Sequence, residues 1–268
     1  MKRRIFIAII PVFLIAFFVI AKKELYTRKP MEFTFDAAYY FQEQEREFCG
    51  WKFEKVPAGH QYYFYLPESV RSNKDDESKK VPLIVVLHGS DEKGSALHKY
   101  GYQFLNEKFQ QKVSPNGAAI LVILSRVNYF TDPKGTDLLI QNVALKNKCI
   151  DKTKIVAYGF SQGAMFAVQL CTAEPRLFKS VISGSGFYQM SKKELLTVLP
   201  VQFYFATAQN DQGIFEQGSP TGKMCAKWCK NSRYVEYKER RHFFVELKDK
   251  TGRGDETALD WICQSVQD

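Results

Sequence analysis

Residues 155–163 read Ile-Val-Ala-Tyr-Gly-Phe-Ser-Gln-Gly, and this stretch decides the fold. A short apolar run ends at Gly159, and an Ala/Met/Phe-rich helical pattern begins at Ala164. The stretch therefore matches the pattern G-x-S-x-G between a strand and a helix, which presents Ser161 at the apex of a sharp turn. A side chain two residues before or after the serine would collide with the turn or with a neighbouring strand, so glycine is expected there. The free N–H groups at the start of the helix face the serine.

Strands and helices are expected to alternate around this turn. The continuous apolar runs at 81–87 and 118–124 are typical of parallel strands buried on both faces. The other expected strands are 51–56, 61–66, 155–158, 181–183, 201–206 and 234–237. The expected helices are 100–111, 136–148, 164–171, 192–198, one starting at 224–229, and 256–266. The alternation predicts an α/β domain with a mostly parallel central sheet and helices on both faces.

The N-terminus has the pattern of a targeting segment. Three basic residues at positions 2–4 precede an uncharged apolar run at 5–21, as in export signals. We therefore expect residues 1–21 to be either a cleaved signal peptide or a retained membrane anchor. Residues 22–50 form a lead-in, and residues 51–268 form the α/β domain, which is long enough to bury a full core. The domain is expected outside the cytoplasm, secreted, periplasmic or membrane-anchored.

Six cysteines in a chain expected to be exported predict disulfide bonds, although free buried thiols remain an alternative. They are Cys49, Cys149, Cys171, Cys225, Cys229 and Cys263. Cys225 and Cys229 lie four positions apart on an expected helix and thus share a face. We expect them to pair with different partners rather than with each other. No second Cys/His pair accompanies them, which argues against a metal site.

The chain carries a formal net charge of +9, mostly from lysines spread along its length. This distribution indicates a solvated surface. No block of interleaved arginines and aromatic residues indicates a nucleic-acid partner. A membrane is expected as a partner only through the N-terminal segment, if that segment is retained.

Ser161 is the candidate nucleophile, and a serine hydroxyl needs a general base within hydrogen-bond reach. The turn resembles that of the α/β-hydrolases, and in their chain order the acid and then the base follow the serine in sequence. Of the four histidines, only His242 does so, in a segment between a strand and the last helix. Asp211, in the loop after the strand at 201–206, is the candidate acid that would orient the imidazole. Glu216 is its nearest competitor.

An oxyanion formed at this serine would need two N–H donors. The first is the backbone N–H of Gln162, directly after the nucleophile. The second is expected in the loop after the strand at 81–87, with Ser90 as the candidate and Asp91 as the alternative. The ring of His88 is expected to order this loop by hydrogen bonding rather than to act in catalysis or bind a metal.

Three stretches resemble the α/β-hydrolase superfamily: 83–90, 151–165 and 175–188. Within it, the chain is most similar to extracellular esterases related to polyhydroxybutyrate depolymerases and to feruloyl or acetylxylan esterases. Those enzymes have an Asp before the nucleophile strand, as at Asp151, and a Pro-then-Phe turn after the nucleophile helix, as at Pro175 and Phe178. Two positions depart from the pattern. Arg241 replaces the usual Gly before the catalytic His, and Gln162 replaces the usual small residue or Asn after the serine.

The resemblance and the residues together imply a serine hydrolase that cleaves carboxylic esters through an acyl-enzyme. Its expected substrate is a small-molecule or polymer-linked ester, and no metal or organic cofactor is expected. Two alternatives remain open: a peptidase related to the prolyl oligopeptidases, and a non-catalytic protein that uses the hydrolase fold for binding.

Overall fold

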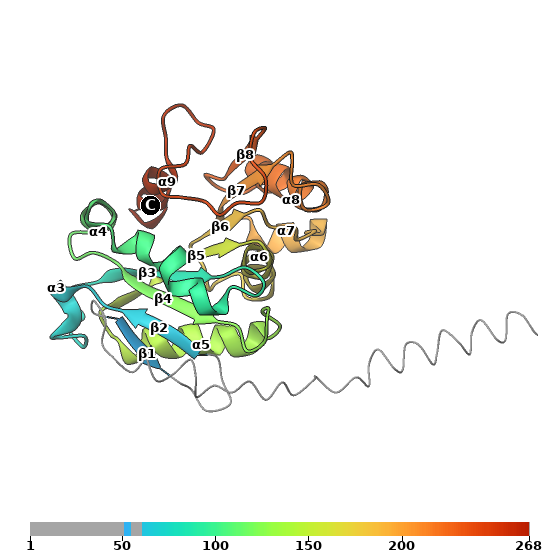
Figure 1. The fold of residues 1–268 in the computed structure, drawn as a ribbon. Helices are drawn as coiled ribbons and strands as arrows, with labels where there is room; N and C mark the ends of the chain where they lie inside the picture. Colours follow the sequence, from blue (N-terminus) through green and yellow to red (C-terminus); the bar gives the residue numbers. More distant parts are fainter. Residues whose placement is uncertain (1–50, 55–60, 268) are drawn as a thin grey trace, which may run out of the picture. The chain divides into compact units, whose positions relative to one another are not determined.

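An eight-stranded sheet forms the middle of the domain in the computed structural model, which describes residues 51–54 and 61–267 (Figure 1). The strand order is β1-β2-β4-β3-β5-β6-β7-β8. β2 lies between β1 and β4 and runs antiparallel to both. The remaining strands, β3 and β5 to β8, run parallel to β4. The bounds are β1 Trp51–Glu54, β2 Gln61–Tyr65, β3 Val81–Leu87, β4 Ala119–Leu124, β5 Ile150–Phe160, β6 Ser180–Gly184, β7 Gln202–Ala208 and β8 Arg233–Tyr237.

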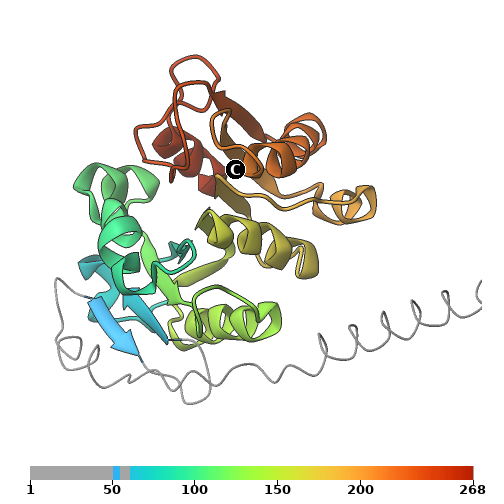
Figure 2. The ribbon, with the colours of Figure 1, turned by 45° about the vertical axis from the view of Figure 1, so that its right-hand side comes forward.

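Helices cover both faces of this sheet, as the alternation predicted (Figures 1 and 2). One face packs against α5 Pro133–Lys146, α6 Gln162–Ala173, α7 Lys192–Val198 and α8 Ile214–Trp228. The other face packs against the short turns η2 Leu97–Gly101 and η3 Tyr102–Leu105, and against α4 Glu107–Val113 and α9 Ala258–Gln267. The remaining short elements are α3 Glu68–Arg71 and η1 Lys93–Ser95. Every residue of β3 and β4 is buried, because both faces of these strands are covered.

The single helix expected at 100–111 is interrupted in the structure. η3 follows η2 directly and ends at Leu105, and the backbone of the next residue, Asn106, leaves the helical region with φ −55° and ψ 128°. The Asn106 side chain accepts a hydrogen bond from the N–H of Lys108 at 3.0 Å and so caps a new helix, α4. Asparagine favours such caps over helix interiors, because its short side chain competes for nearby backbone groups.

The helix expected to begin near residue 224 instead ends there, because α8 runs from Ile214 to Trp228. α8 contains two glycines and Pro220, which are the residue types with the lowest helix propensity. The glycines allow α8 to approach its neighbours closely. A Cβ on Gly218 would lie 1.9 Å from the carbonyl oxygen of Gly186, and a Cβ on Gly222 would lie 2.5 Å from the Tyr234 ring.

The predicted targeting segment and lead-in, residues 1–50, lie outside the described residues. Within 51–54 and 61–267, no helix combines the length and the apolar character needed to cross a membrane.

The five cysteines of the described region are buried free thiols, and Cys49 lies outside that region. Cys263 packs on one face of the sheet and the other four on the opposite face, so the sheet separates Cys263 from them. Cys229 directly follows α8, and the thiol of Cys225 within α8 donates to the sulfur of Met190 at 3.9 Å. The predicted disulfides thus find no support among the described residues.

Candidate active site

Ser161 lies at the sharp turn between β5 and α6. Its φ of 54° and ψ of −119° place it in a region that is strained for any residue other than glycine. The turn is held by backbone hydrogen bonds on both sides. The N–H of Ser161 donates to the carbonyl of Gly184 at 2.9 Å, and its carbonyl accepts from the N–H of Met165 at 3.0 Å. A strained residue that is fixed in this way indicates a functional position.

The two glycines around this serine leave no room for a side chain, as the sequence predicted. A Cβ on Gly159 would lie 2.5 Å from the Cα of Ala164. A Cβ on Gly163 would lie 2.3 Å from the carbonyl oxygens of both Leu87 and His88. Gly163 therefore lets the start of α6 lie directly against the end of β3, where the candidate oxyanion loop begins.

His242 and Asp211 meet at the same edge of the sheet as Ser161. Asp211 follows β7 and His242 follows β8, and their Nδ1 and Oδ2 atoms are 2.7 Å apart. The carboxylate side chain is only 12% exposed and the imidazole 37%. The ring of Phe160, the residue before Ser161, packs against the imidazole with ring centroids 4.9 Å apart. Of the two carboxylates considered for this imidazole, Asp211 is the one that contacts it, whereas Glu216 is exposed in the first turn of α8.

The segment that carries His242 is held to the parallel strands by two hydrogen bonds. The N–H of Phe243 donates to the hydroxyl of Ser185 at 3.1 Å, and the hydroxyl of Tyr158 donates to the carbonyl of Val245 at 2.8 Å. Sequence reasoning missed both contacts, because the bonded residues are 58 and 87 positions apart. The one local signal was the position of Tyr158 inside the stretch that identified the turn.

An ion pair between Arg240 and Asp249 joins the two ends of the segment that carries His242. Both terminal nitrogens of Arg240 donate to the carboxylate of Asp249, at 2.8 and 2.6 Å, and this carboxylate side chain is only 2% exposed. The guanidinium also lies over the rings of Tyr237 and Phe243 at 4.3 and 4.7 Å from their centroids. Arginine suits this position because its planar group can stack on rings while it binds a carboxylate through two hydrogen bonds.

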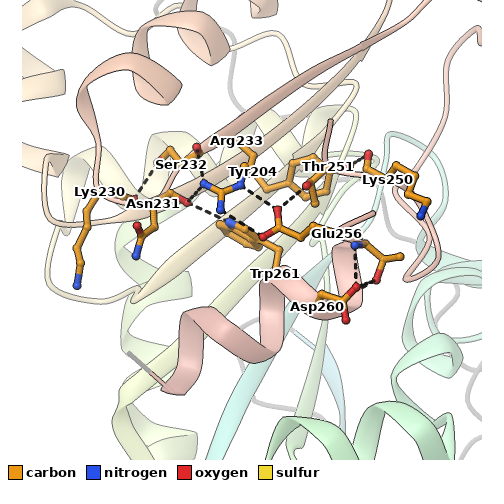
Figure 3. A network of polar contacts seen from close by, with 11 residues as sticks. Tyr204, Lys230, Asn231, Ser232, Arg233, Lys250, Thr251, Glu256, Asp260 and Trp261 are labelled. Carbon is orange, nitrogen blue, oxygen red and sulfur yellow. Dashed lines mark hydrogen bonds and ion pairs between the residues drawn. The ribbon is translucent and has the colours of Figure 1, made fainter. Parts of the chain in front are cut away.

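A second ion pair joins Arg233 in β8 to Glu256, which follows the His242 segment in the chain (Figure 3). Nε and Nη2 of Arg233 lie 2.9 and 3.2 Å from the carboxylate of Glu256. The indole N–H of Trp261 in α9 donates to the carbonyl of Asn231 at 3.1 Å, and Arg233 donates to the same carbonyl at 3.1 Å. The chain is thus anchored both within the His242 segment and just before the last helix.

His88 is fully buried and orders the loop after β3, as expected from sequence. Its Nδ1 lies 2.6 Å from the carbonyl oxygen of Gly89, and its Nε2 accepts from the N–H of Ser125 at 3.1 Å. Because the carbonyl can only accept and the backbone N–H can only donate, we assign the ring proton to Nδ1. Burial lowers the pKa of His88 to about 4, so the ring is neutral near pH 7.

The loop after His88 contains the two candidates for the second oxyanion donor. Asp91 has a φ of 59°, and its N–H already donates a hydrogen bond to the carbonyl of Asn128 at 2.8 Å. Ser90 is exposed, and its N–H makes no hydrogen bond within residues 51–54 and 61–267. Gln162, the candidate for the first donor, is the first residue of α6, where the backbone N–H has no partner within the helix.

Comparisons with known proteins agree with this architecture. A family model described as phospholipase/carboxylesterase matches residues 134–204, a stretch that includes Ser161. No curated protein matches the chain.

Solved structures of esterases are similar in fold at low sequence identity. A thermostable esterase is 18% identical with a TM-score of 0.51, and the match covers 80% of this chain but only 59% of the esterase. A ferulic acid esterase is 12% identical with a TM-score of 0.53, covering 69% of this chain and 86% of that one. A hyperthermophilic esterase from the archaeon Pyrobaculum calidifontis is 14% identical with a TM-score of 0.56, covering 87% and 90%. The chain therefore has the α/β-hydrolase fold, and its residues 134–204 are similar to the phospholipase/carboxylesterase family.

Proposed function

We propose that this protein is a serine hydrolase that cleaves carboxylic esters through an acyl-enzyme on Ser161. The observation that carries the proposal is the 2.7 Å contact between His242 and Asp211 at the sheet edge that also bears the strained serine. A base, an acid that orients it and a nucleophile on a fixed turn are the parts that acyl transfer by serine requires.

In the first half of the proposed reaction, the Ser161 hydroxyl attacks the ester carbonyl carbon while Nε2 of His242 takes its proton. Asp211 accepts a hydrogen bond from the Nδ1–H of the imidazole and stabilises the imidazolium. The carbonyl oxygen becomes an oxyanion that receives hydrogen bonds from the backbone N–H groups of Gln162 and Ser90. When the tetrahedral intermediate collapses, the bond to the alcohol breaks, and His242 gives its proton to the leaving oxygen.

The second half repeats these steps with water as the nucleophile. His242 takes a proton from the water as it attacks the acyl carbon, and a second oxyanion forms in the same place. Collapse of this intermediate breaks the ester bond to Ser161, whose oxygen regains its proton from His242. The products are one carboxylic acid and one alcohol, and the enzyme returns to its starting state.

The short connection between β6 and β7 supports short acyl esters or esters attached to a polymer as substrates. Only α7, with seven residues, lies in this connection, which leaves little material for a large lid. The similarity to a ferulic acid esterase adds feruloyl esters to this set. Rates that fall steadily from butyrate to longer nitrophenyl esters would support this specificity, whereas a preference for long acyl chains would contradict it.

A fluorophosphonate probe tests the nucleophile directly, because it forms a stable bond only with an activated serine. We expect the wild-type protein and the surface control Ser72→Ala to be labelled, and Ser161→Ala to remain unlabelled. Labelling that survives Ser161→Ala would refute the assignment. A folded wild-type protein without labelling or ester hydrolysis would favour a binding protein, and cleavage of Pro-containing peptides in preference to esters would favour a peptidase.

We also propose that residues 1–21 direct the protein out of the cytoplasm, as a signal peptide or as a membrane anchor. The basic residues followed by an apolar run support this proposal. Fractionation of cells that express the full chain tests it, together with the mass of the mature protein. A product that retains its N-terminus and stays in the cytoplasmic fraction would contradict both forms of the proposal.

A further inference from the structure

The side chain of Gln162 makes a pair of hydrogen bonds that its place in the turn does not require. Its Oε1 accepts from the N–H of Phe130 at 2.9 Å, and its Nε2 donates to the carbonyl of Phe130 at 2.9 Å. The residue is only 6% exposed. Both ends of the amide are therefore used to bind the backbone of one residue in the loop between β4 and α5.

This loop lies between the nucleophile turn and the candidate oxyanion loop. At its start, the N–H of Ser125 donates to Nε2 of His88 at 3.1 Å. In its middle, the carbonyl of Asn128 accepts the N–H of Asp91 at 2.8 Å. At its end, the Phe130 ring packs against the His88 ring with centroids 4.8 Å apart. A shift of the loop would therefore move the backbone around residue 91 with it.

The bond to Asn128 fixes the peptide that follows Ser90. Asp91 has a positive φ, which a residue other than glycine adopts only where its surroundings hold it. The N–H of Ser90 belongs to the preceding Gly89–Ser90 peptide, whose carbonyl accepts from Nδ1 of His88 at 2.6 Å, and Nε2 of His88 accepts from the N–H of Ser125 at the start of the loop. The direction of the Ser90 N–H therefore depends on the loop that Gln162 holds.

We propose that the Gln162 side chain is a positioning residue that sets the second oxyanion donor by clamping the loop between β4 and α5. The inference rests on the proposed ester hydrolysis. Gln162 then serves both halves of the oxyanion hole: its backbone N–H is the first donor, and its side chain holds the loop whose Ser125 and Asn128 contact the peptides on either side of Ser90, Ser125 through His88.

Gln162→Met separates the two roles, because methionine keeps the backbone N–H, the side-chain length and a high helix propensity but cannot bind Phe130. Loss of one oxyanion donor costs about 10²–10³-fold in kcat, and a misplaced donor should cost part of that. We expect kcat on a short nitrophenyl ester to fall about 10- to 100-fold, while KM changes by less than about threefold. Gln169→Met, on the same helix, is the matched control and should keep wild-type kinetics.

Two further readouts distinguish positioning from general damage. The apparent pKa in the pH profile of kcat/KM should match the wild type, because His242 and Asp211 are untouched. The affinity for a trifluoromethyl ketone inhibitor, whose adduct with the serine carries an oxyanion, should fall in parallel with kcat/KM.

If Gln162→Met does not fold, Gln162→Leu decides, because leucine is also apolar and favours a helix but makes no hydrogen bond with Phe130. Kinetics within threefold of the wild type for whichever variant folds would overturn the inference and leave the proposed function intact. A wild-type protein that neither hydrolyses esters nor reacts with fluorophosphonate would instead overturn the proposed function.

Discussion

Acidification is expected to destabilise the protein through one buried imidazole, that of His88. The ring is fully buried, and its pKa in the folded protein is lowered to about 4 from an ordinary value of 6.5. Between these two values, the unfolded chain binds a proton at His88 and the folded protein does not. The free energy of unfolding therefore falls as the pH falls through this window.

The magnitude follows from the two pKa values. At pH 5 the imidazole is mostly protonated in the unfolded chain and mostly neutral in the folded protein, which removes about 2 kcal/mol of stability. The loss is complete below pH 4, where it reaches about 3 kcal/mol, since each pKa unit corresponds to about 1.4 kcal/mol. At pH 7 both states are largely neutral and the contribution is close to zero.

Urea unfolding at pH 7, 6, 5 and 4 measures this contribution, with His88→Gln as the test variant. Glutamine can still accept the Ser125 N–H but does not titrate. We expect this variant to be less stable than the wild type at pH 7 and to have a shallower dependence on pH between 6.5 and 4. His98→Gln is the control, because His98 is exposed, and should retain the wild-type slope. Equal slopes for the wild type and His88→Gln would refute the reasoning.

Three further substitutions test the site and its supports. Asp211→Asn should lower kcat on a short aryl ester by about 10⁴-fold, as loss of the orienting acid does in serine hydrolases, while Glu216→Gln should leave it unchanged. Gly163→Ala should cost about 3 kcal/mol in urea unfolding and most of the activity, because its Cβ would meet two backbone oxygens at 2.3 Å; wild-type stability would contradict this. Arg233→Met should cost about 3 kcal/mol by leaving Glu256 buried without its cation, and adding Glu256→Leu should restore much of that loss in the same assay.

Several features of the fold could be predicted because short-range patterns control them. β3 has the predicted bounds, since a continuous apolar run is sufficient to identify a buried parallel strand. The helix at Lys192–Val198 also has its predicted bounds, with Ser191 and Glu194 forming a capping box at its start. The single helix predicted at 100–111 was wrong, because the capping preference of Asn106 interrupts the helix despite the apolar spacing of the segment. α8 was missed because its glycines serve contacts with distant segments.

The candidate site also has features that the sequence predicted and contacts that only the tertiary structure revealed. The order of Ser161, Asp211 and His242 in the chain was sufficient to nominate a nucleophile, an acid and a base. The hydrogen bonds that hold the His242 segment and the Gln162 side chain join residues that only the folded sheet brings together. Cysteine parity predicted disulfides, but burial of the described thiols on opposite faces of the sheet is a property of the tertiary structure.

By itself, the sequence determined that a serine would occupy a strained turn between a strand and a helix, because the glycines around it are the residues that the turn admits. It also determined the parallel sheet, since apolar runs separated by helical segments have few other ways to bury their surfaces. Only the tertiary structure decided that His242 contacts Asp211 and that Gln162 reaches across to Phe130. Those contacts depend on where strands β4, β5, β7 and β8 end relative to one another, and the packing of the whole sheet fixes that arrangement.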